Sequence, residues 1–173
     1  MAVQKKVYTN PKSNSPLLST ISSGCKTPLL DVKFCCLVNP YRYPNSPLIP
    51  RYSITCVVNP QEEMDFLAAI QAIEKDEGVE TVIKSETEKK NDEWVNTGNI
   101  LVKFQTKNQI PIYLADEMEN GKPVQIALED ELGFGEKVKI IYDILRYTKR
   151  TKSETTQHGL SFKPTAIYYY PKD

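Results

Sequence analysis

The chain has 173 residues, of which 40% are apolar and 12 are proline, and its 22 basic residues balance its 22 acidic residues. A chain of this size removes roughly 68 to 70% of its unfolded surface from water, so it needs no metal or disulfide framework to fold. The four cysteines form no CxxC pair and a single histidine accompanies them, which disfavours zinc. The chain has neither a membrane-length apolar run nor a signal-peptide pattern, so we expect an intracellular protein.

The neutral total hides a segregation of charge along the chain. Basic segments could share one face that binds a polyanion, or the acidic segments could simply solvate one side of the protein. The net charges by segment are +6 over 1–60, −7 over 61–93, +2 over 94–115, −6 over 116–136 and +5 over 137–163.

The first half of the chain predicts an arm and two strands. Residues 1–28 are rich in Ser, Thr, Asn, Pro and Lys, which is typical of a partly ordered N-terminal arm, so a single domain is expected over 29–173. Alternation predicts a strand near 30–38 with Phe34 among its inward residues. The segment 39–50 holds four prolines and should be a stiff, extended loop, and alternation resumes over 51–58.

A helix is predicted after the second strand. Asn59 suits an N-cap and Pro60 suits the first turn. Phe66, Ile70 and Ile73 form one apolar stripe, and a glycine follows at 78, where a left-handed residue commonly ends a helix.

The second half of the chain predicts further strands. Nine consecutive polar residues at 85–93 indicate a loop before a strand near 94–104, and Asn120 with Gly121 predicts a hairpin turn. A long strand is predicted over 138–147, followed by a polar loop over 148–158 and a final strand over 160–170.

These elements predict a mainly β, α+β fold. The economical architecture is a five-stranded antiparallel Greek-key barrel of the OB-fold type with a helix inserted after the second strand, because closure removes sheet edges. A β-sandwich is the alternative.

Catalytic motifs are missing from the sequence. There is no GxGxxG, Walker loop, HExxH or GxSxG, and His158 has no obvious orienting partner. We therefore expect no enzyme, no cofactor and no metal. The alternative is a metal-dependent nuclease that would use the carboxylates near 116–119 and 129–131.

Aromatic and basic residues are interleaved in two predicted loops. Single-stranded nucleic acid is held by cations that follow the phosphates and by aromatic rings that stack on bases. The alternatives are tyrosines packed on their own barrel and lysines that are merely solvated. Trp94, Phe104 and Phe162 are interpreted as core or rim residues rather than stacking platforms. The candidate binding residues in and beside these loops are Tyr41, Arg42, Tyr43, Arg51, Arg146, Tyr147, Lys149, Arg150 and Lys152.

Two stretches carry a resemblance to a known family. The strand RYSITCVV at 51–58 followed by Asn59 and Pro60, and the late segment FGEKVKIIYDILRY at 134–147 followed by HGLSFK at 158–163, resemble phage-encoded single-stranded DNA-binding proteins of the replication type. The resemblance covers about residues 29–170. The alternative function is a phage structural protein with a β-sandwich fold, which would explain the strands and the proline-rich arm but not the basic residues beside tyrosines.

This resemblance implies an OB-fold with an inserted helix and non-specific protection of single-stranded DNA in phage replication and recombination. The implied setting is the host cytoplasm, with replication or recombination proteins as partners, homodimerisation as an option and no membrane. Members often carry an acidic tail that recruits replication partners, whereas this sequence ends YYYPKD, so recruitment through such a tail is not expected and the acidic segments 61–93 and 116–136 could serve instead. The residues implied for the groove, beside Arg146 and Tyr147, are Lys139, Phe162 and Lys163.

Overall fold

The computed structural model describes residues 17–42, 49–79, 83–150 and 155–171, apart from the side chains of Leu17, Lys149 and Arg150. Within these residues the fold is mainly β, with one helix, as the sequence predicts. The elements are β1 (Leu17–Lys26), β2 (Leu30–Tyr41), β3 (Arg51–Val58), α1 (Met64–Glu77), β4 (Lys84–Lys90), β5 (Glu93–Thr106), β6 (Ile112–Glu119), β7 (Lys122–Ile126), β8 (Lys137–Arg150) and β9 (Thr156–Tyr170).

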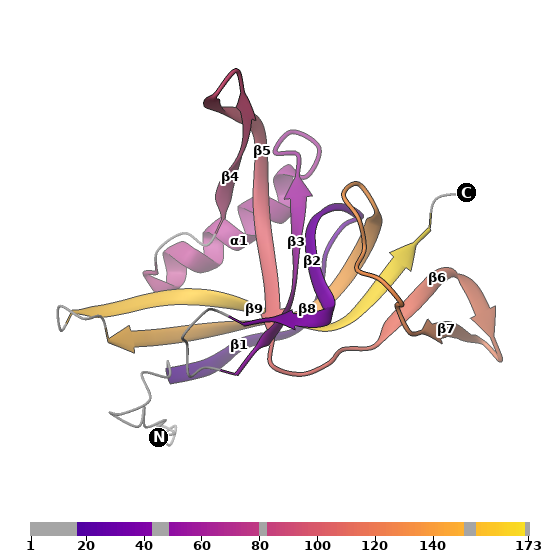
Figure 1. Cartoon of the computed structure of the whole chain (residues 1–173). Coiled ribbons are helices and arrows are strands. Elements are labelled where there is room, and N and C mark those ends of the chain that lie inside the picture. The colour runs from indigo at the N-terminus through magenta and orange to yellow at the C-terminus, as the bar shows by residue number, and fades with distance from the viewer. Residues whose placement is uncertain (1–16, 43–48, 80–82, 151–154, 172–173) are drawn as a thin grey trace, which may run out of the picture.

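The strand pairings connect all nine described strands (Figure 1). Strand β8 pairs with β2, β2 with β3, β3 with β5, β5 with β9, and β9 again with β8. Strand β9 runs parallel to β5 and β6, whereas the other described pairings are antiparallel. The β6–β7 hairpin extends this arrangement beyond β9, and β1 extends it beyond β8.

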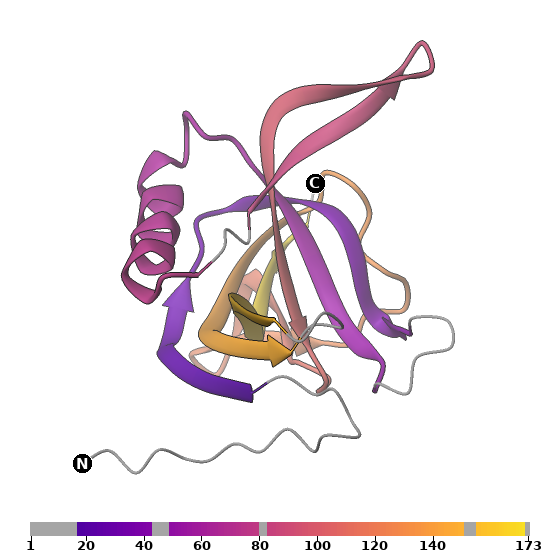
Figure 2. The same cartoon turned by 90° about the vertical axis from the view of Figure 1, so that its left-hand side faces the viewer.

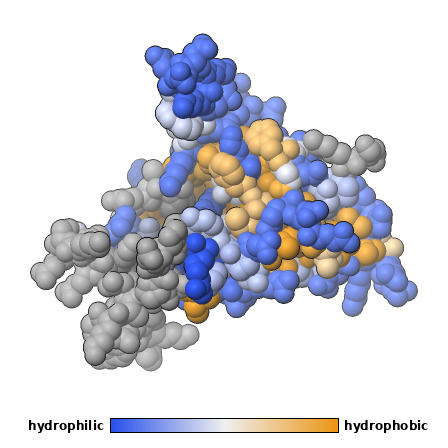
Figure 3. Space-filling view, viewed as in Figure 1, coloured by the Kyte–Doolittle hydropathy of each residue, from blue (hydrophilic) through white to orange (hydrophobic). Residues whose placement is uncertain are grey.

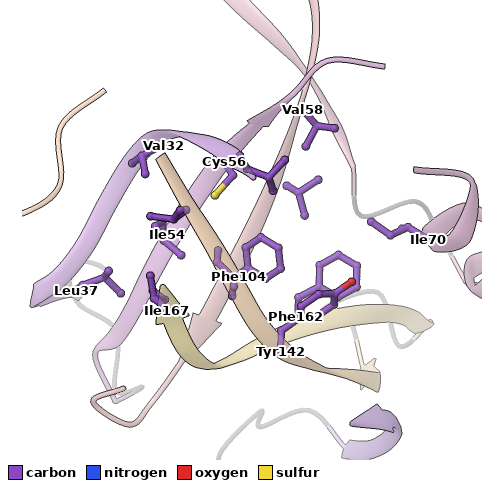
Figure 4. Close-up of a cluster of buried hydrophobic side chains, with 14 of the residues drawn as sticks. Val32, Leu37, Ile54, Cys56, Val58, Ile70, Phe104, Tyr142, Phe162 and Ile167 are labelled. Carbon is purple, nitrogen blue, oxygen red and sulfur yellow. The ribbon is translucent and has the colours of Figure 1, made fainter. Parts of the chain in front are cut away.

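The core lies between these strands and helix α1 (Figure 4). Phe104 contacts Tyr142 and Phe162, with ring centroids 5.2 and 5.7 Å away. Ile70 of α1 is 2% exposed, so the helix contributes its apolar stripe to the same core. The alternation predicted for β3 is confirmed, because Ile54, Cys56 and Val58 are all fully buried.

Local signals placed the helix and one hairpin correctly. Asn59 Oδ1 accepts hydrogen bonds from the N–H groups of Gln61 and Glu62, so it caps the turn that leads into α1. The helix itself begins later than predicted, at Met64, with Glu63 at the N-cap position. Gly78 ends the helix in the left-handed conformation with φ of 63°. Asn120 and Gly121 also have positive φ values, as a tight hairpin turn requires.

The predicted course of β2 is wrong after Val32. Val32 pairs with Cys56, yet Phe34 pairs with Thr55, so one extra residue is accommodated on β2 as a β-bulge. A one-residue shift sends every following side chain to the opposite face. Leu37 is therefore buried, and Phe34, which alternation placed inside, is 61% exposed.

Two segments without a predicted strand are strands in the structure. Residues 17–26, assigned by composition to the N-terminal arm, form β1 and pair with β8. Residues 84–90, within the expected polar loop, form β4 and pair with β5, and Asn91 and Asp92 make the turn between them with φ of 51° and 64°. Polar composition concealed both strands, because β-pairing depends on a partner as well as on side-chain hydropathy.

Candidate nucleic-acid interface

The end of β2 presents the first group of predicted residues. Tyr41 is 48% exposed and lies opposite Arg51, which begins β3, and Arg42 is exposed just beyond the strand. Tyr43 lies outside the described residues. The structure thus brings a tyrosine and two arginines together at the place where the predicted loop begins.

The side chain of Glu131 holds this end of β2 in place. The Glu131 carboxylate accepts hydrogen bonds from three successive backbone N–H groups, those of Leu37, Val38 and Asn39, the last two at 2.8 Å. A carboxylate held by several backbone donors makes strong, charge-assisted hydrogen bonds. These hydrogen bonds fix the part of β2 just before Tyr41 to the loop that precedes β8. Glu131 in that loop lies 90 residues after Tyr41 in the chain.

The β8–β9 hairpin carries the second group of predicted residues. The polar loop is shorter than expected, because β8 continues through Lys149 and Arg150 and β9 begins at Thr156. The side chains of Lys149 and Arg150, and all of Lys152, lie outside the described residues. Arg146 is half-buried and donates a hydrogen bond to Thr148 at 3.5 Å.

Tyr147 has a packing role in this hairpin. It pairs with Gly159 across the strands, and a Cβ atom placed on Gly159 would lie 2.4 Å from the Tyr147 ring. The ring therefore covers the backbone of Gly159, and a side chain at this position would have to displace the ring. A base can meet Tyr147 only on the part of the ring that Gly159 leaves open.

Phe162 requires a correction. The resemblance placed it in the groove, but its side chain is 3% exposed and its ring packs against Phe104 and Tyr142 (Figure 4). Phe162 is thus a core residue with no ring face open to a base. The interpretation of Phe104 as a core residue is confirmed, since it is fully buried, whereas Trp94 is 71% exposed.

The two remaining predicted lysines lie on the outer side of the β8–β9 hairpin. Lys139 is exposed, and its Nζ atom lies 5.7 Å from the centroid of the Tyr170 ring. Lys163 is half-buried and opposite Asp143. These lysines lie on the β8–β9 side of the fold, so the predicted residues do not form one compact group.

The face formed by β2, β3 and β5 contains residues that the sequence analysis missed. Phe34 pairs with Thr55, and Thr55 pairs with Lys103, so an aromatic ring, a hydroxyl and an ammonium stand in one row across three strands. The next row is Cys36, Ser53 and Gln105. Figure 3 shows apolar surface over β2 and β3, beneath the projecting β4–β5 hairpin.

A second exposed ring lies beside this face. Phe134 is 70% exposed, and the Nζ atom of Lys33 lies 5.1 Å from its centroid and 5.8 Å from that of Phe34. Cation–π contacts of this kind hold an ammonium against aromatic rings. Lys33 is the extra residue of the bulge, so the same irregularity that exposes Phe34 also places the cation between the two rings.

The position of Lys33 is fixed from the opposite side by β4. Its Nζ atom forms a 2.9 Å ion pair with Glu86, which also accepts hydrogen bonds from Thr97 and Asn99. Burial alone would raise the pKa of Glu86, but the bonds from Lys33, Thr97 and Asn99 lower it below its usual range. Glu86 thus stays ionised. Through its ion pair with Lys33, it connects the base of the β4–β5 hairpin to the rings of Phe34 and Phe134.

The sequence held one signal for Phe134 and none for Phe34. Phe134 stands between Gly133 and Gly135, and a large ring in so short a loop has few neighbours to cover it. Phe34 belongs to a regular alternation that only the bulge interrupts. Lys103 lies within a strand that the sequence predicts. That Lys103 and Phe34 share a face follows only from the pairing of β2, β3 and β5.

The predicted acidic clusters are separated in the structure. Asp116, Glu117 and Glu119 are exposed on β6, whereas Glu131 is engaged by the backbone of β2. The described part of the chain contains no group of three His, Cys, Asp or Glu side chains placed to hold a metal ion. Among the same residues, no helix combines the length and apolar character needed to cross a bilayer.

Comparisons with known proteins place this arrangement in a class of folds. No family model and no curated protein matches the sequence. Among solved structures, the chain is similar to the single-stranded DNA-binding protein from bacteriophage Enc34 in complex with single-stranded DNA, with a TM-score of 0.62 at 13% identity over 94% of this chain and 97% of that one. A C-terminal truncation of the Enc34 protein gives a TM-score of 0.59 at 12% identity over 86% of this chain and 85% of that one.

The chain therefore shares its fold with the single-stranded DNA-binding protein from bacteriophage Enc34. This likeness extends over nearly the whole length of both chains. This confirms the likeness in fold that the sequence resemblance implied.

Proposed function

We propose that the chain binds single-stranded DNA without sequence specificity and coats it during phage replication and recombination in the host cytoplasm. The observation that carries the proposal is the row formed by Phe34, Thr55 and Lys103 beside Phe134. Exposed rings stack on bases and ammonium groups neutralise phosphates, and both are needed to hold a flexible strand. The shared fold with a protein solved in complex with single-stranded DNA supports the same conclusion.

The absence of sequence preference follows from the chemistry of the face. Every base has a π-face, so a phenylalanine ring accepts any of the four. The hydroxyl and amide groups of Thr55, Ser53 and Gln105 can contact sugar and phosphate oxygens without reading base edges. Neighbouring contacts are proposed for the residues predicted from sequence, which are Tyr41, Arg42, Tyr43, Arg51, Lys139, Arg146, Tyr147, Lys149, Arg150, Lys152 and Lys163.

We further propose that the five strands β2, β3, β5, β9 and β8 form an OB-fold-like barrel. Their pairings return to the first strand, which supports closure, although β5 and β9 share one pair and β2 and β8 share two. In OB-folds, oligonucleotides bind on a face with two flanking loops. In this chain the corresponding loops would be those between β2 and β3 and between β8 and β9. The domain would occupy 29–173, preceded by an arm over 1–28 whose residues 17–26 add β1 to the edge of β8.

A gel shift with a labelled oligonucleotide tests the proposed function. We expect retarded single-stranded DNA, much weaker binding of duplex DNA, and an intact strand in the presence of Mg²⁺ or Mn²⁺. Affinity should fall with salt at a slope near −3 if about four phosphates are contacted, at roughly −0.7 each. Cleavage would favour the nuclease alternative, and a lack of binding would favour a phage structural protein. Replication or recombination proteins and a second copy of the chain are the proposed protein partners.

A further inference from the structure

The β4–β5 hairpin projects from the body of the protein as an arm. Strand β3 pairs with β5 only as far as Val58 and Ile100, and residues 93–99 have β4 as their described partner. At about 3.3 Å per residue, the arm extends roughly 20 Å beyond the end of β3. Figures 1 and 2 both show the hairpin standing clear of the other elements.

An exposed tryptophan lies near the tip of this arm. Trp94 is 71% exposed, and Val95, on the opposite face of the hairpin, is 41% exposed. Trp94 pairs with Lys89, whose ammonium lies 4.0 Å from the exposed Asp92 carboxylate in the turn, and the adjacent pair on the same face is Thr87 with Asn96. Tryptophan is enriched among the residues that dominate protein–protein binding energy. The exposed tryptophan at this tip is therefore suited to bind an apolar hollow on another protein surface.

A hollow of matching chemistry lies between helix α1 and strands β1 and β8. It has a volume of about 450 Å³, and its apolar lining includes Phe66, Ala69 and Ile73 of the helix and Tyr142 and Ile144 of β8. The charged residues of this lining are two carboxylates at the helix start, Glu63 and Asp65, and the ammonium of Lys26 at the end of β1. An indole would replace water against the apolar lining, and the two carboxylates, which outnumber the one lining ammonium, would attract the Lys89 ammonium beside the indole.

The arm and the hollow lie on opposite sides of one molecule. Figure 2 shows α1 and β1 on the left, whereas the hairpin leans to the upper right. The arm of one copy therefore cannot fill its own hollow. An anchor and a receptor on different surfaces generate head-to-tail contacts, which continue as an open array unless rotation closes them into a ring.

We propose that the Trp94 tip of one copy inserts into the α1–β1–β8 hollow of the next copy along a DNA strand. The role on DNA rests on the proposed function, whereas the contact itself does not. One side chain and its surroundings bury less than the roughly 1,200 Å² of a stable interface, so the contact is weak between free molecules. A shared strand raises the local concentration of neighbouring copies, and the same contact then makes binding cooperative.

Three variants test the proposal on oligonucleotides of two lengths. Trp94→Ala removes the anchor, and Ala69→Lys places a charge in the hollow at an exposed helix position. Met118→Ala is the control, because it alters a 61% exposed apolar residue on the β6–β7 hairpin. We expect all three to bind a one-copy oligonucleotide within twofold of wild type. On a long strand, the first two should lose cooperativity and at least tenfold of affinity per copy, and Met118→Ala should lose neither.

Each other outcome has a defined meaning. If wild type binds both lengths with the same affinity per copy, the contact is refuted and the proposed function stands. If Trp94→Ala weakens binding to the short oligonucleotide as strongly as to the long one, Trp94 stacks on bases and the proposed contact is wrong. If wild type binds neither length, the proposed function fails, and the contact is then tested without DNA.

Sedimentation at high protein concentration provides that second test. Wild type should self-associate into a series of sizes, and each of Trp94→Ala and Ala69→Lys should remain monomeric. An equimolar mixture of these two variants should form pairs and nothing larger, because one supplies an intact hollow and the other an intact anchor. A monomeric wild type, or association of Trp94→Ala by itself to the wild-type extent, would overturn the proposal.

Discussion

Phe34→Ala separates binding from folding at the proposed DNA face. The ring is 61% exposed, so less than half of its surface contributes to stability. Full burial of a phenylalanine stabilises by up to about 3 kcal/mol, so the loss of the part-buried ring should cost roughly 1 kcal/mol. A lost stacking contact should cost about 1 to 3 kcal/mol of binding, which is roughly a five- to 150-fold weaker affinity.

Fluorescence anisotropy of a labelled oligonucleotide at several salt concentrations measures the affinity and its salt dependence. The salt dependence separates phosphate contacts from base stacking. Phe34→Ala should weaken binding at every salt concentration without changing the slope, because the ring touches no phosphate. Lys103→Ala should instead reduce the magnitude of the slope by about 0.7, the contribution of one phosphate contact on a single strand. Met118→Ala is the matched control, since Met118 is also 61% exposed and lies on another hairpin.

Either of two results would refute the roles assigned to Phe34 and Lys103. One is an unchanged affinity for Phe34→Ala in a protein whose melting temperature shows that it is folded. The other is a change in salt slope for Phe34→Ala with none for Lys103→Ala, because that would reverse the assigned roles of ring and ammonium.

Three further predictions concern other parts of the fold. Phe162→Ala should destabilise the protein by about 3 to 5 kcal/mol in urea unfolding, as for a core ring, with unchanged affinity per folded molecule. The hydrogen bond to Glu136, with burial, raises the pKa of Tyr169 to about 12, so this contact stabilises the fold fully below pH 10 and is lost as pH rises through 12. Burial also raises the pKa of Tyr142 to about 12, so ultraviolet titration should show two late phenols among the described residues, of which Glu136→Gln makes one earlier. A combined alanine substitution in and beside the β8–β9 loop should reduce the salt slope by up to about 2 at nearly constant stability. The residues changed together are Lys149, Arg150 and Lys152.

The sequence by itself determined the features that depend on near neighbours in the chain. Alternation identified the buried face of β3, and the left-handed Gly78 and the Asn120–Gly121 turn occur where predicted, whereas Asn59 caps a turn that precedes the helix and the helix N-cap is Glu63. These signals reflect backbone preferences and hydrogen bonds over a few residues, so they survive in almost any tertiary context. The aromatic and basic residues at the ends of β2 and β8 were likewise visible in the sequence.

Only the tertiary structure decided which side chains share a surface. The bulge at Lys33 depends on how β2 pairs with β3, and it alone turns Phe34 outward beside Thr55 and Lys103. Strands β1 and β4 exist because β8 and β5 offer them partners, which polar composition does not reveal. Side-chain period identifies two alternating faces, but the partner strand decides the register and hence which face is buried. The proposed binding face is therefore a property of pairings between distant segments.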